Sequence, residues 1–207
     1  MALQERGIRT RRLILEAAAG VFAESGYDGA STTAILARTG LTRGALYHHF
    51  ASKEDIAAAL VDVQSEALVA PERSIRLQAV IDLTLSFARK LQRDPVLQAG
   101  VRLAVEQTSF SEGKVVAYQR SAEVVLALLA EAAERGELQR DVDVGDVADL
   151  VVGAFTGVQL MSQIYTERRD LLHRTSVLWR CLLPGIAAPE LLPHLRTTPE
   201  PVDGTAK

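Results

Sequence analysis

The residues best suited to chemistry are hydrogen-bond donors and small side chains that gather in one short stretch. They are Thr42, Arg43, Gly44, Ala45, Tyr47, His48 and, a little further on, Lys53. Small residues let a helix approach another molecule closely, and the donors can bond phosphates or reach base edges. Leu46 and Phe50 are four residues apart, so they share one apolar face of the same helix. This combination suits a helix lying in the major groove of DNA, and it predicts a nucleic-acid interface.

Two short helices joined by a tight turn are expected to position these residues. Ser31 or Thr32 can cap the first helix, and Thr42 can cap the second. Gly40 stands where the first helix needs a left-handed stop. Lys53, at the start of the next helix, is placed for a phosphate contact. Further DNA contacts are expected from Arg11, Thr32 and Thr33.

The segment GLTRGALYHHF at residues 40–50, followed by Ser-Lys-Glu at 52–54, resembles the DNA-binding signature of TetR-family repressors. Ala-Ala-Ala-Gly-Val-Phe at 17–22 and Gly-Tyr-Asp at 26–28 fit the same pattern, so the motif covers residues 10–55. The alternative is a similar helix pair inside an unrelated α-helical domain. The resemblance implies an all-α, TetR-like fold, with an N-terminal three-helix helix-turn-helix (HTH) domain and a larger helical domain for ligand binding and dimerisation.

Composition independently favours an all-α protein. The 207 residues are 48% hydrophobic and 5% aromatic, which supports a sizeable core in one large or two small domains. The apolar residues recur with helical spacing, and no alternating β pattern bounded by turns occurs. The expected domains are an HTH domain at 1–53 and a ligand-binding and dimerisation domain at 54–195. A helix at 52–70 links them, and 196–207 is expected to be a disordered tail.

The charge is unevenly distributed along the chain. The net charge is −3, but residues 1–53 carry seven Arg and Lys against four acids, which gives them +3 and leaves −6 for the remainder. A basic head on an acidic body fits DNA contact at one end only. Cys181 is the only cysteine, so no intramolecular disulfide can form. With no apolar signal segment at the N-terminus, this favours a cytoplasmic protein.

The rest of the chain is expected to form helices separated by clear breaks. Residues 1–9 resemble a mobile basic arm or a plain disordered tail. Glu106–Gly113 is expected to be a loop, and Pro184-Gly185 should stop the last helix. Helices are expected at about 10–25, from Ser74 to the break at Asp94-Pro95, and at about 95–105, 114–135, 144–166 and 170–183.

The helices expected at 144–166 and 170–183 are more apolar than the surface of a monomer allows. Gly153 and Gly157 lie four apart, a spacing that lets another helix approach closely. The second helix has a stripe of Leu171, Thr175, Leu178 and Leu182. A homodimer joined through these two helices as a four-helix bundle would bury both, and the alternative is an ordinary core within one chain. Residues 150–166 are uncharged, yet their polar side chains favour an interface helix over a membrane span.

A pocket for a small-molecule effector is expected in the second domain, between the C-terminal half of the linking helix and three later helices. The polar candidates on apolar faces are Gln64, Gln107, Tyr118, Thr156, Gln159 and Gln163. The further residues expected to line the pocket are Leu83, Phe87, Val101 and Trp179. Each is also compatible with a core or surface role.

A second, less specific resemblance spans nearly the whole chain. The chain is similar to γ-butyrolactone autoregulator receptors of actinomycetes, which leave DNA when a small lactone or related hormone binds. The similarity is carried by Asp62–Ser65, Asp94–Ala104, Asp141–Val144 and Trp179. The resemblance implies that Gln64 and Thr156 bond the polar head of the hormone. Many of these receptors have a tryptophan early in the helix expected at 114–135, but this chain has none around residues 118–122. Either Tyr118 replaces it, or the ligand is a butenolide, a furan or an antibiotic.

Two other functions compete with a ligand-responsive repressor. An enzyme would have to combine Cys181 or Ser176 with His173 and Asp170. However, Asp170, His173 and Ser176 are spaced along one helix without an oxyanion motif. The other competitor is a pseudo-receptor, a DNA-binding protein of the same fold that senses no such hormone. No catalytic residues, metal ligands or cofactor are expected, because phosphate loops and Cys/His metal spacings are absent from the sequence.

Overall fold

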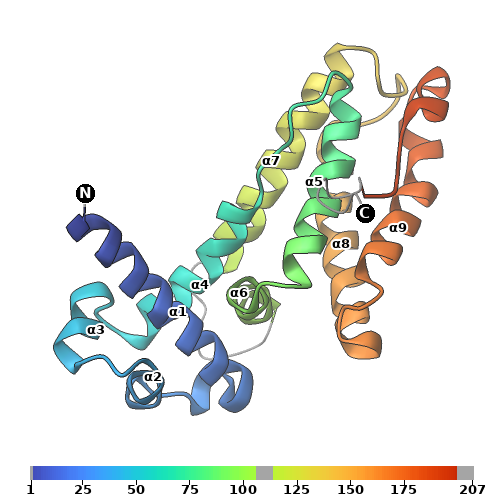
Figure 1. The fold of residues 1–207 in the computed structure, drawn as a ribbon. Helices are drawn as coiled ribbons and strands as arrows, with labels where there is room; N and C mark the ends of the chain where they lie inside the picture. Colours follow the sequence, from blue (N-terminus) through green and yellow to red (C-terminus); the bar gives the residue numbers. More distant parts are fainter. Residues whose placement is uncertain (1, 106–113, 200–207) are drawn as a thin grey trace, which may run out of the picture. The chain divides into compact units, whose positions relative to one another are not determined.

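The computed structural model describes residues 2–105 and 114–199, and these residues are mostly helical (Figure 1). The helices are α1 (Ala2–Gly29), α2 (Thr32–Thr39), α3 (Arg43–His49), α4 (Lys53–Ala67), α5 (Arg76–Leu91), α6 (Pro95–Val105), α7 (Lys114–Glu134), α8 (Val144–Thr166), α9 (Leu171–Ile186) and the 3₁₀ helix η1 (Pro189–His194). Within the described ranges there is no strand beyond an isolated bridge between Leu138 and Ala187. The all-α fold is confirmed, while the loop expected at 106–113, with Gln107, lies outside the described residues.

The chain folds into two compact units that differ from the expected domains. Unit 1 comprises Met1–Ala67 and Arg93–Tyr118, and unit 2 comprises Leu68–Gln92 and Gln119–Lys207. The helices α4 and α6 therefore pack with the HTH helices, whereas the expected boundary lay at residue 53. The contacts between α4 and α6 join segments far apart in sequence, so no local sequence signal could reveal this division.

Unit 1 is built on the apolar stripe of α1. Ile14, Ala18, Val21 and Phe22 are all buried, as their spacing predicts. The left-handed conformation of Gly26, at φ 67°, interrupts α1 at the predicted position.

The N-terminal arm expected at residues 1–9 is wrong for the described residues, because α1 already begins at Ala2. The sequence from Ala2 to Arg6 consists of strong helix formers, and α1 continues through Gly7 to Thr10 without interruption. The Thr10 hydroxyl also donates to the carbonyl of Arg6 at 2.9 Å, a bond within the helix.

The helices α4 and α6 approach each other closely at Gly100. A Cβ atom at this position would lie 2.1 Å from the carbonyl oxygen of Leu60. The side chain of Gln64 is buried there, and its Nε2 donates to the carbonyl of Gly100 at 3.1 Å. Glycine at residue 100 is thus required by the packing of unit 1.

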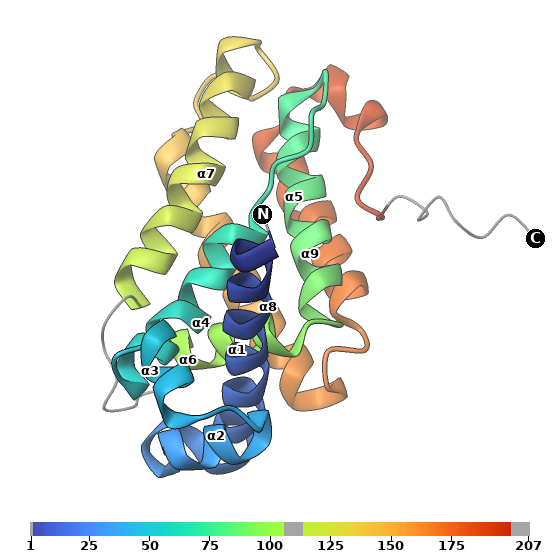
Figure 2. The same cartoon turned by 60° about the vertical axis from the view of Figure 1, so that its left-hand side comes forward.

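In unit 2, α5 is the central helix and is buried on nearly every side. It lies beside α9 in both views (Figures 1 and 2). The carboxylate of Glu137 accepts a hydrogen bond from the backbone N–H of Leu77 at 2.8 Å, and so satisfies a free donor at the start of α5. At the end of α7, Gly136 has φ 70°, which confirms it as the predicted stop.

The C-terminal part of unit 2 corrects two expectations. α9 continues to Ile186 with Pro184 inside it, because a proline in the last turn removes only one helical bond. The next turn still closes, since the N–H of Ala187 donates to the carbonyl of Leu183 at 2.9 Å. The tail expected from residue 196 is ordered at its start, where both backbone groups of Arg196 bond the side chain of Gln78.

α8 exposes much of its apolar surface. By length and composition α8 could cross a membrane, and only a small part of it is buried in the unit. Its exposed apolar side chains include Leu150, Leu160, Met161, Ile164 and Tyr165. On α9, Leu171 and Thr175 are buried within the unit, so that half of the predicted interface stripe belongs to the core instead.

Candidate DNA interface and effector site

The turn between α2 and α3 is built by the capping residues that the sequence predicts. The Ser31 hydroxyl accepts from the N–H of Ala34 at 3.1 Å and caps α2. Gly40 ends α2 in the left-handed region, at φ 66°. The Thr42 hydroxyl accepts from the N–H of Ala45 at 3.2 Å and caps α3. The predicted pair of helices is therefore confirmed (Figure 2).

α3 buries one face and exposes the residues expected to meet DNA. Leu46 and Phe50 are buried in the core of unit 1, as their spacing predicts. The exposed residues are Thr42, Arg43, Gly44, Tyr47 and His48, with Ala45 half-buried beside them. A short helix that exposes a glycine and several hydrogen-bond donors can enter a groove of duplex DNA.

Arg43 and Tyr47 contact each other on the exposed face of α3. The Arg43 guanidinium lies over the Tyr47 ring, 5.4 Å from its centroid. A hydrogen bond with Thr32, and then one with Arg43, lower the pKa of the Tyr47 phenol. The Arg43 guanidinium therefore packs against an exposed aromatic ring among the donors of α3.

Lys53 has a structural role that the sequence did not predict. Its Nζ donates to the backbone carbonyls of Tyr27 at 2.9 Å and Ala30 at 3.2 Å, and lies over the Tyr27 ring. The Tyr27 phenol donates to Glu54 at 2.9 Å, so the predicted core position of Tyr27 is also a link to α4. Lys53 therefore fixes the end of α1 against the start of α4, and a phosphate contact by its ammonium stays a prediction.

The remaining residues expected at the DNA lie on α1 and α2. Arg11 is exposed, and its guanidinium lies over the ring of Phe50, 5.3 Å from the centroid. Thr33 is exposed and Thr32 is half-buried at the start of α2. These positions keep them available on the surface of unit 1.

The residues expected to bind an effector divide between the two units. Unit 1 contains Gln64, Val101 and Tyr118. Gln64 and Val101 are buried, and Tyr118 is half-buried. The Gln64 amide already bonds Gly100, so a contact with an effector would act on the junction of α4 and α6.

The other expected effector residues lie in unit 2, where most are buried. They are Leu83, Phe87, Thr156, Gln159 and Trp179. The Trp179 indole N–H donates to the hydroxyl of Thr84 at 2.7 Å, and the ring has no exposed surface. The Thr156 hydroxyl donates to the carbonyl of Val152 at 2.8 Å. Trp179 is therefore a core residue of unit 2, and its role as a pocket wall stays a prediction.

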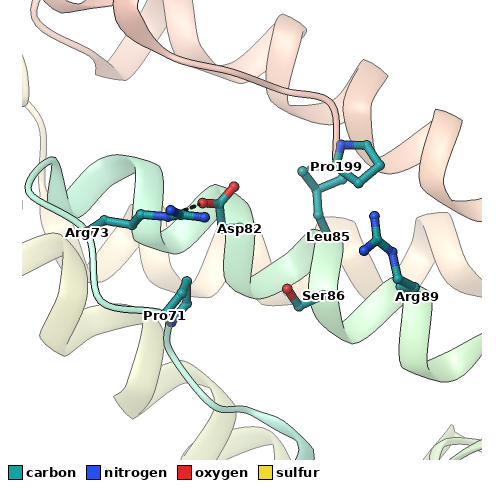
Figure 3. A pocket seen from close by; sticks show the side chains of 7 residues that line it. All are labelled: Pro71, Arg73, Asp82, Leu85, Ser86, Arg89 and Pro199. Carbon is teal, nitrogen blue, oxygen red and sulfur yellow. Dashed lines mark hydrogen bonds and ion pairs between the residues drawn. The ribbon is translucent and has the colours of Figure 1, made fainter. Parts of the chain in front are cut away.

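Neither of two hollows along the described residues of unit 2 is lined by the residues expected to bind an effector. One lies on α5 and has a volume of about 60 Å³, which holds a few water molecules at most (Figure 3). Figure 3 shows the Arg73 guanidinium pointing to Asp82, to which it bonds at 2.6 Å. The residues that line this hollow are Pro71, Arg73, Asp82, Leu85, Ser86, Arg89 and Pro199.

The second hollow lies between the exposed faces of α8 and α9 and measures about 670 Å³. It is lined by Ala154, Gly157, Val158, Met161, Asp170, His173, Arg174, Val177, Leu178 and Cys181. Three of the four residues weighed for an enzyme thus meet here, but Ser176 does not line the hollow.

Family comparisons identify the class of protein. A family described as bacterial regulatory proteins, tetR family, matches residues 14–60, and a tetracyclin repressor-like C-terminal domain matches residues 74–188. The chain therefore belongs to the TetR family. It is a TetR-type transcriptional repressor and not an enzyme.

Comparison with individual proteins shows which TetR-family regulators this chain resembles. The A-factor receptor protein of Streptomyces griseus is 36% identical over 95% of this chain and 70% of its own length. The TetR regulator TylP of Streptomyces fradiae superposes with a TM-score of 0.86 at 39% identity, covering 93% of each chain. A γ-butyrolactone receptor (ArpA-like protein) gives a TM-score of 0.70 at 30% identity, over 89% of this chain and 91% of that one. The predicted resemblance to this group of receptors is confirmed.

Proposed function

We propose that this repressor binds a pseudo-palindromic operator as a homodimer and releases it when a small hormone-like molecule binds. The observation that carries the proposal is the exposed donor face of α3, which is capped by Thr42 and carries the paired side chains of Arg43 and Tyr47. A single helix of seven residues reads few bases, so two copies on two half-sites are needed for specificity.

We propose α8 and α9 as the dimer interface. TetR regulators bind DNA as dimers, and these helices present the apolar face and the hollow of about 670 Å³. A Cβ atom at Gly153 or Gly157 would have no neighbour within 4 Å, so both glycines leave room for another helix. Asp170 and Arg174 line the same hollow, which suits a second protein chain better than lipid.

The proposed effector is a γ-butyrolactone, a butenolide or a similar molecule. The names of the S. griseus and ArpA-like relatives support this class. Control of antibiotic and other secondary metabolism is the corresponding role, and the cytoplasm, where operator DNA lies, is the location. The missing tryptophan near Tyr118 keeps the pseudo-receptor, or a receptor for an antibiotic, as the alternative.

The proposed switch acts through α4. Gln64 lies eleven residues beyond Lys53, which is about 16 Å along a helix. An effector that bonds the Gln64 side chain would pull on α4 at its junction with α6 and so tilt α4. Half-sites about 34–36 Å apart tolerate little change in the spacing of two recognition helices. The effector must bind the DNA-incompetent state more tightly, because equal affinity shifts nothing.

Selection from random duplex DNA tests the proposed function. We expect enrichment of an inverted repeat, and sedimentation of the complex as one or more protein dimers. Gly157→Leu should weaken dimerisation, whereas Gly7→Leu, at a site with free space in α1, should not. A wild-type monomer at micromolar concentration would contradict the dimer, and enrichment of no sequence would contradict operator binding.

Variants of the proposed effector site separate the two alternatives. Gln64→Ala and Thr156→Val should bind operator nearly as wild type and respond less to the inducing culture extract. If both release DNA at the wild-type dose, the effector site lies elsewhere. If the wild-type protein binds operator and no extract releases it, the pseudo-receptor is favoured.

A further inference from the structure

Arg168 is buried in unit 2 without an acidic partner among the described residues. Only 8% of the residue is exposed. It lies in the turn after α8, and its backbone is held on both sides. Its N–H donates to the carbonyl of Ser162 at 3.1 Å, and its own carbonyl accepts from Gln92 Nε2 at 2.6 Å. The turn therefore fixes the side chain inside the unit.

The guanidinium of Arg168 has few hydrogen-bond partners. Its Nη2 lies 3.5 Å from the Oε1 atom of Gln159, and its Nε has no acceptor in the part of the chain that the structure describes. A guanidinium carries five N–H donors and stays protonated in proteins. Burial lowers the pKa of Arg168, although the charge remains. Burying an unpaired charge is strongly unfavourable, so this guanidinium favours an anionic partner.

Two acids lie close to Arg168 in sequence: Glu167, which is exposed, and Asp170, which is committed to other donors. Oδ1 of Asp170 accepts from the hydroxyls of Ser162 and Thr166, both at 2.6 Å. Its Oδ2 accepts from Nε of Arg174 at 2.7 Å. The turn therefore contains a carboxylate, and it is used to close the turn rather than to neutralise Arg168.

An apolar wall adjoins this polar group. Phe155 precedes Gln159 by four residues, so the two side chains share a face of α8. The ring of Phe155 meets that of Phe87 edge-on, with centroids 5.7 Å apart. Phe155 is only half-buried, so its ring has surface left for a ligand. A polar end and an apolar wall on one helix face suit an amphipathic molecule.

We propose that Arg168 and Gln159 bind the carboxylate of a small molecule whose apolar part lies along Phe155. The Nε–H and one Nη–H of arginine point the same way and match two carboxylate oxygens. The inference rests on the proposed function, and within it the effector is a similar molecule that carries a carboxylate rather than a neutral γ-butyrolactone. It also explains a buried charge that the free protein does not neutralise.

The proposal predicts an unusual stability for the free protein. An arginine that only supports the fold should be needed for stability, but an unpaired buried charge opposes folding. Arg168→Met should therefore melt at or above the wild-type temperature in buffer without carboxylates. A melting temperature several degrees below wild type would overturn the proposal.

Octanoate and octanamide are the probes, since they differ in charge and hardly in shape. Trp179 is the only tryptophan, is buried in unit 2, and bonds Thr84, three residues before Phe87. Its fluorescence therefore reports on binding without DNA. We expect the full-length protein to bind octanoate at least tenfold more tightly than octanamide, because a charge-assisted pair is lost in the amide. Equal binding of the two, or none of octanoate at millimolar concentration, would overturn the proposal.

Variants locate the site. Arg168→Gln should abolish the preference for octanoate, and Arg168→Lys should reduce it because an ammonium lacks the planar fork. The control is Arg169→Gln, since Arg169 is the exposed neighbour in the same turn and should leave binding unchanged. Unchanged octanoate binding by Arg168→Gln would overturn the proposal.

Two measurements separate this proposal from its alternatives. If an acidic residue of a second copy paired with Arg168, Arg168→Met would dissociate the dimer in sedimentation, and the proposal would fail. Failure of the wild-type protein to bind any operator would instead reject the proposed function. The octanoate titration is done without DNA, so its result would still test the carboxylate site.

Discussion

Gly100→Ala should destabilise the protein although it adds only one methyl group. The new Cβ would lie 2.1 Å from the carbonyl oxygen of Leu60 and 2.9 Å from its carbonyl carbon. These are backbone atoms, so no side chain can turn away. To reach even 3.0 Å, the Leu60 oxygen must retreat by 0.9 Å, and α4 must move away from α6 with it.

The magnitude follows from three contributions. Overpacking of this kind costs about 3 kcal/mol at the rigid end of its range. Moving the helices apart also weakens the buried bond from Gln64 to Gly100, worth about 1 kcal/mol. Alanine favours a helix over glycine by up to ~1 kcal/mol, which offsets part of the loss. The expected net loss in free energy of unfolding is about 3 kcal/mol.

Urea unfolding followed by circular dichroism, at a fixed protein concentration, measures this loss. The matched control is Gly7→Ala in α1, where a Cβ meets nothing within 4 Å. The control should be neutral or slightly stabilising, and it calibrates the gain in helix propensity. If Gly100→Ala unfolds within 0.5 kcal/mol of the control, roughly the spread of ordinary surface substitutions, the close approach of α4 and α6 is wrong.

Three further changes test the HTH and the turn after α8. Arg43→Ala should reduce the preference for operator over random DNA by about 1–3 kcal/mol, measured by fluorescence anisotropy; an unchanged ratio would mean that Arg43 reads no base. Lys53→Ala should weaken binding to operator and to random DNA alike. It should also lower the melting temperature, because the Lys53 ammonium bonds the Tyr27 carbonyl. If only one of these two changes is measured, Lys53 has only the corresponding role. The hydroxyl of Ser162 is the first cause that lowers the pKa of Asp170 from 3.8 to about 2. The ionised carboxylate therefore stabilises the fold above pH 3.8, and this is lost as the pH falls toward 2. Asp170→Asn should melt below wild type at pH 7, and the gap should narrow across that range; a constant gap would contradict the shift.

Much of the local structure was predictable because its signals lie within a few residues. Ser31, Gly40 and Thr42 define the helix-turn-helix through caps that act over three or four positions. The bounds of α6 and α8 match the prediction for the same reason, since Pro95 starts one and Asp143 caps the other. A strong motif and helical periodicity were sufficient for the fold and for the position of the recognition helix.

The remaining features depend on contacts between residues far apart in sequence. Lys53 bonds a carbonyl 26 residues earlier, and Gln64 bonds one 36 residues later. Neither partner has a sequence signature, because a backbone carbonyl looks alike at every residue. Arg168 reads as one of several arginines after α8, and only the fold shows that it is the buried one. The effector residues were predicted one by one, and their division between two units was not.

Release of operator DNA by a small molecule tests the central claim most directly. Fluorescence anisotropy is measured on a labelled operator that the protein itself has selected. An organic extract is then added, prepared from a culture of the organism that encodes the protein. The account predicts tight binding that falls to the level of random DNA as extract is added, with recovery when the small molecules are removed by dialysis. An operator that stays bound at every dose would contradict a ligand-responsive repressor, and no operator binding at low salt would contradict the recognition helix itself.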